Sequence, residues 1–272
     1  MKHGIICPVA QLERFATLSD FHLILPHLVE KYPKYTEFYR DRIDKGDHVL
    51  LDNSIFEYGV SYDYKKMIDI ACRLNVSEMS APEVLRDRIA SRILRDEFLN
   101  YYSKSDCKIP VIAVAQGHDV FEVIDSYFEL LEIKEIPYLG LPFDIDEQIP
   151  GVSEHVHSLT LRRVLNRWYL VECIYERSLK KKVQLKPTHL MGLSDPVELQ
   201  RYVGEKYKWV RSNDSSSAFV HGSNLIIYTE RGLFGEKISQ KLDFEGYENL
   251  SQEQVNCIMM NINTIFKWIA YD

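Results

Sequence analysis

Acidic and amide side chains follow short apolar runs at several points of this chain. Asp52, Asn53 and Ser54 follow "VLL", Glu83 follows "SAP", and Gln116 follows "VIAVA". A carboxylate can attack a carbon or move a proton, and an amide can orient a polar ligand. Taken singly, such an acid is more often a helix cap or a turn residue. Chemistry therefore depends on whether the fold gathers these side chains.

The stretch "WVRSNDSSSAF", Trp209 to Phe219, poses the same question most sharply. A short apolar run ends in Ser212, Asn213, Asp214 and three further serines, a composition that we do not expect inside a packed strand. The stretch fits a turn, a helix start at Ser215–Ser217, or the polar mouth of a sheet. We interpret it as a strand end that presents Asp214.

Eight short apolar runs alternate with segments of helical periodicity. This alternation indicates βαβ units and a parallel sheet, and eight units in about 250 residues are typical of a (β/α)8 barrel. An open doubly wound sheet is the alternative, but no GxGxxG follows an early run. The predicted strands are His3–Val9, Phe21–Leu25, His48–Leu51, Val76–Ser80, Pro110–Ala115, Pro137–Leu141, His189–Leu193 and Lys208–Arg211.

The helical segments complete the predicted fold. We expect one α/β domain over residues 1–272, a TIM-like (β/α)8 barrel with an additional C-terminal strand at Leu225–Tyr228 and a C-terminal helix at Gln252–Ala270. In such a barrel, functional residues collect at the carboxyl ends of the strands. The predicted helices between the strands include Tyr64–Leu74, Arg86–Tyr101, Val120–Leu131, Leu159–Tyr175 and Pro196–Lys206.

Five segments resemble the tRNA-guanine transglycosylase superfamily in their order and approximate spacing. They are "VLLDNSIFEYG", "VIAVAQG", "YLGLPFD", "HLMGLSDPVEL" and "VRSNDSSSAF", and the resemblance covers about residues 48–220. "HLMGLSDPVEL" is the most specific of the five. The short chain looks most like the small phage-type branch that inserts 7-deazaguanines into DNA.

The resemblance implies an exchange of guanine in nucleic acid for a 7-deazaguanine such as 7-cyano-7-deazaguanine. It implies Asp214 as the nucleophile, Asp52 as the general acid and base, and no cofactor. The chain departs from the family in having Asn53-Ser54-Ile55 where the family has Ser-Gly-Gly, and Pro82-Glu83 where an Asp usually reads the base. The substrate-binding residues implied are Asn53, Ser54, Glu83, Gln116, Gly117, Gly140, Leu141, Met191, Gly192 and Ser212.

Charge and cysteine content bound the partners. The net charge of −7 speaks against broad nucleic-acid affinity, but the interval 162–186 holds eight basic and two acidic side chains, a net +6. We expect Arg177, Lys180, Lys181 and Lys182 to contact phosphates near the rim of the barrel. The alternative is a solvated helix face.

The five scattered cysteines form no CxxC pair, which predicts neither a disulfide framework nor a zinc site and fits a reducing cytoplasm.

The expected partners are therefore nucleic acid, with DNA preferred to tRNA, and a 7-deazaguanine base. A homodimer is possible on this reading, and no membrane association is expected. The expected location is the cytoplasm, that of the host cell if the gene is phage-borne. Three alternatives remain open: the same exchange on tRNA, a catalytically inactive barrel that binds nucleic acid or a partner, and a glycosidase that uses Asp52 and Asp214 on a small nucleoside.

Overall fold

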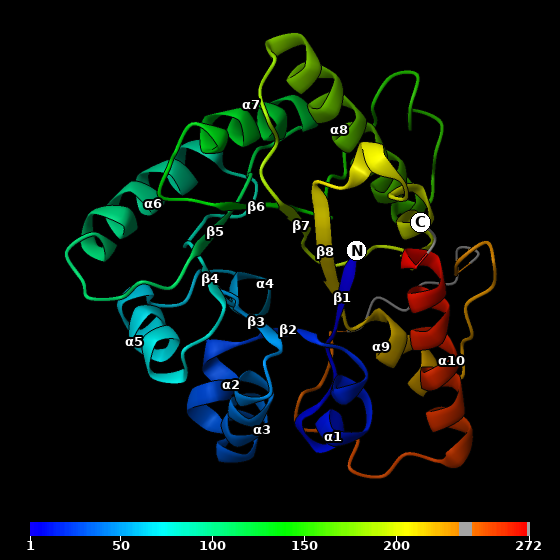
Figure 1. The fold of residues 1–272 in the computed structure, drawn as a ribbon. Helices are drawn as coiled ribbons and strands as arrows, with labels where there is room; N and C mark the ends of the chain where they lie inside the picture. Colours follow the sequence, from blue (N-terminus) through cyan, green and yellow to red (C-terminus); the bar gives the residue numbers. More distant parts are fainter. Residues whose placement is uncertain (234–240, 271–272) are drawn as a thin grey trace. The chain divides into compact units, whose positions relative to one another are not determined.

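The computed structural model describes residues 1–233 and 241–270, in which strands and helices alternate (Figure 1). Each predicted run contains or overlaps one strand, so the eight predicted strands are confirmed. The strands are β1 (Lys2–Ile5), β2 (Phe21–Ile24), β3 (His48–Leu51), β4 (Glu78–Ser80), β5 (Val111–Val114), β6 (Tyr138–Leu141), β7 (Thr188–Leu190) and β8 (Val210–Ser215).

The helices fill the intervals between the strands. They are α1 (Leu12–Phe15), α2 (Pro26–Lys31), α3 (Pro33–Asp44), α4 (Ile55–Tyr58), α5 (Tyr64–Leu74), α6 (Arg88–Tyr102), α7 (Val120–Leu131), α8 (Leu159–Lys181), α9 (Ser217–Ser223) and α10 (Gln252–Ile269). The described residues also form short 3-10 helices, which are η1 (Val9–Gln11), η2 (Ala16–Leu18), η3 (Pro196–Arg201) and η4 (Glu205–Tyr207).

The strands form one sheet with the order β1-β8-β7-β6-β5-β4-β3-β2. β1 pairs with β8, β3 with β4, β4 with β5, and β5 with β6, each in parallel. Parallel neighbours need a crossover connection, and helices supply it here. Strand order and alternation are those of the α/β, (β/α)8 TIM-like fold, which confirms the predicted fold class.

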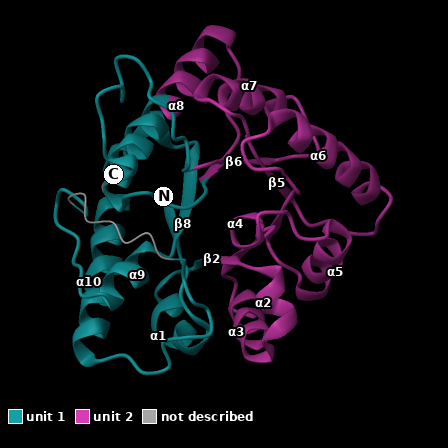
Figure 2. Ribbon diagram, turned by 180° about the vertical axis from the view of Figure 1, so that it is seen from behind, with its two compact units in different colours: residues 1–22, 143–169, 190–272 teal, residues 23–142, 170–189 magenta. Residues whose placement is uncertain are grey.

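The described chain divides into two compact units (Figure 2). Unit 2 comprises residues 23–142 and 170–189, and its buried core includes Leu50, Met79 and Ile112 of three adjacent strands. Its helix α5 begins where the side chain of Asp63 accepts hydrogen bonds from the backbone N–H groups of the first turn. The helix ends at Asn75, whose φ is 56°. These local signals explain why α5 matches its predicted bounds.

Unit 1 comprises residues 1–22, 143–169 and the described part of 190–272. Its helix α10 begins with a capping box between Ser251 and Gln254, and the predicted C-terminal helix is confirmed. α9 packs closely on α10 at Gly222. A Cβ at this position would lie 2.6 Å from the backbone of Ile258, so the close approach requires glycine. β1 and β8 place Gly4 opposite Asp214.

β8 corrects the expectation that a strand ends before the polar stretch. The strand continues through Ser212, Asn213 and Asp214 to Ser215, and these side chains are buried. Asn213 Oδ1 accepts a hydrogen bond from His3 Nδ1 at 2.6 Å, and its Nδ2 donates to the carbonyl of Lys2 at 3.3 Å. Asn213 is tolerated inside the strand because the neighbouring strand β1 supplies partners for its amide.

Two other predicted elements differ from the structure. Residues 225–228 form no strand, because a side chain of α10 rather than a strand satisfies their backbone. Asn261 Oδ1 accepts from Tyr228 N at 2.8 Å, and Asn261 Nδ2 donates to Ile226 O at 2.9 Å. The predicted helix Pro196–Lys206 is wrong as well, since this segment contains only the short 3-10 helices η3 and η4.

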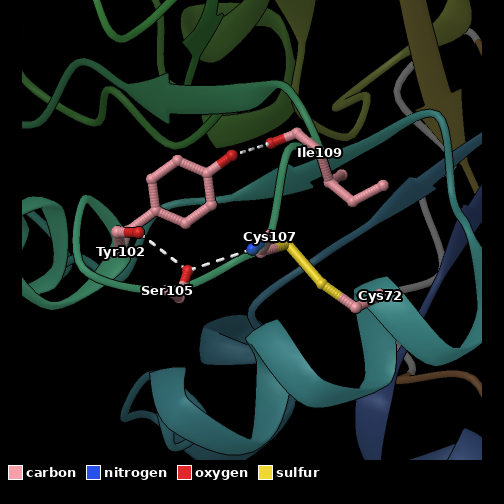
Figure 3. Close-up of a disulfide and its surroundings, with 5 residues drawn as sticks. All are labelled: Cys72, Tyr102, Ser105, Cys107 and Ile109. Atoms are coloured by element: carbon pink, nitrogen blue, oxygen red, sulfur yellow. Dashed lines mark hydrogen bonds between the residues drawn. A yellow bond between two sulfur atoms is a disulfide. The ribbon is translucent and has the colours of Figure 1, made fainter.

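A disulfide joins Cys72 of α5 to Cys107, which precedes β5 (Figure 3). Their Cα atoms lie 6.0 Å apart across 35 residues of sequence. The segment before Cys107 is held locally, since Ser105 Oγ donates to Tyr102 O at 2.7 Å and accepts from Cys107 N at 3.3 Å. The sequence predicted no disulfide framework and indicated no pairing, because the βαβ fold brings together two cysteines whose spacing carries no signal.

Candidate functional site

The turn that follows β3 holds three of the predicted site residues in a buried position. Asp52, Asn53 and Ser54 are all buried, and Ser54 has a left-handed φ of 55°. Asp52 Oδ2 accepts a hydrogen bond from Ser54 N at 2.9 Å, and Asn53 Oδ1 accepts from Ile55 N at 3.0 Å. These side chains compensate the unusual backbone of the turn and fix Asp52 at the strand end.

The carboxylate of Glu83, which follows β4, is buried between two amide side chains. Asn53 Nδ2 donates to Glu83 Oε1 at 3.2 Å, and Gln116 Nε2 donates to Glu83 Oε2 at 3.0 Å. Ser61 Oγ accepts from Glu83 N at 2.8 Å and donates to Glu83 O at 2.7 Å. The carboxylate and its backbone are thus both fixed, and the amide donors offset part of the cost of burying it.

Gln116 extends this network to the end of β5. Its Oε1 accepts from the backbone N–H of Arg86 at 2.9 Å, which directs its Nε2 toward Glu83. Ser80 at the end of β4 donates to Asp52 Oδ1 at 3.4 Å. The polar groups that follow β3, β4 and β5 therefore form one buried group in unit 2, which we call the acid–amide cluster: Asp52, Asn53, Glu83 and Gln116.

His27 was missed by the sequence analysis and belongs to the surroundings of this cluster. Its Nδ1 lies 2.9 Å from Ser54 Oγ, and its ring packs edge-on against Tyr58 at 4.9 Å. Burial, and then the nearby charge of Lys31, lower the pKa of His27 and favour the neutral ring. His27 follows β2 closely, so inspection of that strand's carboxyl end would have found it.

Asp214 has a separate setting in unit 1. Its Oδ1 accepts a hydrogen bond from the backbone N–H of Gly192 at 3.0 Å. Met191 and Gly192 follow β7 directly, and Gly192 has a left-handed φ of 59°. A Cβ at Gly192 would lie 3.0 Å from the ring of Phe143. Backbone conformation and space both favour glycine there, and the turn directs its N–H at Asp214.

A wholly buried arginine supports the turn that contacts Asp214. Arg167 Nη1 donates to Met191 O at 3.0 Å, and Nη2 donates to Gly192 O at 2.8 Å and pairs with Glu198. Burial lowers the pKa of Arg167 to about 10, against the opposing influence of charges that include Asp214. Arg167 is one of the eight basic residues of the interval 162–186, and its burial removes it from any basic surface formed there.

Packing explains why two other predicted substrate-binding residues are glycines, and two more are buried in strands. A Cβ on Gly117 would lie 2.6 Å from backbone at the start of α7, and one on Gly140 would lie 2.8 Å from Val114 Cγ2. Leu141 is fully buried at the end of β6, and Ser212 is buried within β8. Contact between these residues and a base stays a prediction.

The basic segment Lys180–Lys182 ends α8 and precedes β7, so it lies at the amino-terminal end of that strand. The expected position near the carboxyl rim is therefore not met. Arg177 pairs with Asp125 at 2.6 Å, and both Arg177 and Lys181 lie over the ring of Phe128. These contacts join α8 to α7. A role of the segment in phosphate binding stays a prediction.

The part of the chain that the structure describes contains no cluster of side chains that could hold a metal ion. Within residues 1–233 and 241–270, no three His, Cys, Asp or Glu side chains gather in a way that could hold an ion. Over the same residues, no helix combines the length and apolarity needed to cross a membrane.

Each unit offers a distinct chemical capacity. The acid–amide cluster of unit 2 supplies a carboxylate fixed by amides, together with a second acid that can exchange protons. Unit 1 supplies Asp214, oriented by a backbone N–H at the end of a neighbouring strand. By fold the chain belongs to the (β/α)8 class of α/β proteins. No protein-family model matches the chain, and its sequence matches no curated protein.

Proposed function

We propose that this protein exchanges guanine in nucleic acid, DNA in preference to tRNA, for a 7-deazaguanine such as 7-cyano-7-deazaguanine. The proposal combines the resemblance of five sequence segments with the two acids at strand ends. The observation that carries it is the fixed carboxylate of Glu83 between Asn53 and Gln116. A carboxylate held in this way is suited to accept hydrogen bonds from two adjacent N–H donors on the edge of a planar ligand.

The guanine edge has this pattern, because its N1–H and 2-amino group point in one direction. Each carboxylate oxygen can accept about two hydrogen bonds. The two amides donate one bond to each oxygen of Glu83, which fixes the orientation in which the carboxylate would meet a bound base. A 7-deazaguanine keeps the same edge, so one pocket serves the leaving and the incoming base. Adenine would present an acceptor at N1 and is disfavoured.

The exchange divides into two halves at the sugar. In the first, an oxygen of Asp214 attacks C1′ as the bond from C1′ to guanine N9 breaks, and the electron pair leaves with the base. Asp52 supplies a proton to the departing guanine. In the second half, Asp52 takes the N9 proton of the 7-deazaguanine, whose N9 attacks C1′ and releases Asp214. The sum consumes no oxidant, reductant or water.

Burial of both acids suits this chemistry. Asp52 and Asp214 are 6% and 5% exposed, so bulk water has limited access to a sugar–enzyme ester. The Gly192 N–H on Asp214 Oδ1 orients the carboxylate before attack. Nucleic acid and a free base are the partners that the proposal requires, and the target base must leave its stack to be exchanged.

The test is incorporation of labelled guanine into either duplex DNA or tRNA, followed by denaturing gels that reveal covalent capture of the polymer. We expect incorporation into DNA, no capture by Asp214→Asn, and residual capture without completed exchange by Asp52→Asn. Asp69→Asn, an exposed acid on α5, is the matched control and should behave as the unchanged protein. Incorporation into tRNA alone would transfer the proposal to that polymer. No incorporation into either would refute it.

A further inference from the structure

Arg167 is fully buried, and burial of an arginine needs a reason. Removing a guanidinium from water is costly, and a buried ion pair is seldom more stabilising than apolar side chains of the same volume. Arg167 and Glu198 are both 0% exposed. Stability alone therefore explains their presence poorly, and the atoms that Arg167 contacts suggest another role.

The contacts of Arg167 run directly to the turn after β7. Two N–H groups of one planar guanidinium donate to the successive carbonyls of Met191 and Gly192, at 3.0 and 2.8 Å. The N–H of Gly192 donates to Asp214 Oδ1 at 3.0 Å. The guanidinium thus fixes the two peptide planes that flank the Cα of Gly192. One of these planes contains the Gly192 N–H, so its orientation sets the direction of the hydrogen bond to Asp214.

We propose that Arg167 is a positioning residue, which holds the Met191–Gly192 turn so that the Gly192 N–H orients the carboxylate of Asp214 for attack. The inference rests on the proposed function for its catalytic consequence, but its structural part does not. Arg167 does not touch substrate on this reading, and acts only through the turn.

The chemistry of the site calls for arginine in particular. Its rigid fork matches two neighbouring carbonyls, whereas lysine would present one compact ammonium. Glu198 balances the charge by pairing with the same guanidinium, and its backbone carbonyl accepts a hydrogen bond from Trp168 Nε1 at 3.0 Å. Phe143 lies against Gly192 from another side. The turn is therefore held by the guanidinium of Arg167, by the ring of Phe143 and by the left-handed backbone conformation of Gly192.

The first measurement is amide hydrogen exchange at Gly192, which does not depend on any enzymatic activity. Asp214→Ala defines how fast Gly192 exchanges without its acceptor. Replacing Arg167 alone leaves Glu198 charged and buried, so the main variant is the double change Arg167→Met and Glu198→Leu, which removes both charges at similar volume. We expect exchange at Gly192 to accelerate toward the rate seen in Asp214→Ala.

The second measurement is the kinetics of base exchange by the same variants. Loss of orientation should lower kcat by about 100-fold, while KM for the base changes little, because the base-reading cluster lies in unit 2. Arg167→Lys should recover part of kcat. Arg162→Met is the matched control: Arg162 lies on the same helix and binds the carbonyls of Asp146 and Val156, but none of the turn.

The outcomes separate the two proposals. Unchanged Gly192 exchange in the double variant overturns the positioning role, and if that variant does not fold, unchanged exchange in Arg167→Lys does the same. Faster Gly192 exchange with an unchanged kcat also overturns it. If the unchanged protein exchanges no base while Gly192 responds as expected, the proposed function fails and the structural hold of Arg167 on the turn stands.

Discussion

The disulfide between Cys72 and Cys107 permits a quantitative prediction about stability. The two cysteines enclose a loop of 35 residues that contains β4 and Glu83. In the chain-entropy description, closing a loop of that length removes conformational freedom from the unfolded chain worth about 3.8 kcal/mol at 25 °C. For a chain of 272 residues, this corresponds to about 7 °C in the midpoint of thermal unfolding.

The change to test is Cys72→Ser together with Cys107→Ser, unfolded by heat and by denaturant without reductant. We expect the double variant to lose about this free energy, and the difference from the unchanged protein to vanish when reductant is added. Cys173→Ser is the control, since Cys173 is a half-buried cysteine that takes no part in the disulfide. Denatured, unreduced protein should titrate only Cys7, Cys173 and Cys257. Five titrating thiols, or equal midpoints without reductant, would refute the reasoning.

Three further predictions address the surroundings of the site. Changing Lys180–Lys182 to alanine should flatten the salt dependence of DNA binding by up to about 0.9 per lysine in the log–log slope, and an unchanged slope would favour a solvated helix end. Burial lowers the pKa of His27, so the unfolded chain takes up its proton first and stability falls on acidification through about pH 6.5. His27→Gln should reduce this fall in denaturant titrations between about pH 7.5 and 5.5, and an identical fall would contradict the assignment. Gly140→Ala should cost about 1–3 kcal/mol of unfolding free energy by collision with Val114, a cost that the added change Val114→Ala should relieve if the collision is its cause.

The sequence by itself determined the fold class and the members of the acid–amide cluster. Apolar runs and helical periodicity are local signals, so the eight strands and helices such as α5 and α7 could be predicted, the two helices at their observed bounds. The rule that parallel strands carry polar residues at their carboxyl ends selected Asp52, Asn53, Glu83 and Gln116. In unit 2, hydrogen bonds link Asn53, Glu83 and Gln116, and Asp52 accepts a hydrogen bond from Ser80 at the end of β4.

Only the tertiary structure decided how buried polar groups are paired. Asn213 is compatible with a strand interior because His3, 210 residues earlier, supplies its partner. Cys72 and Cys107 show no motif, and their pairing depends on the approach of α5 to the segment before β5. Such partners are invisible in a pattern because sequence separation does not set spatial distance once the chain folds.

Arg167 shows the same limit most clearly. In the sequence it is one of eight basic residues in a short interval, and the surrounding charge favours an exposed position. In the fold it is wholly buried beside Glu198 and two carbonyls of the turn after β7. A helix pattern indicates which face of α8 turns inward, but a buried charge is tolerated only where the packed structure brings a counter-charge and acceptors to it.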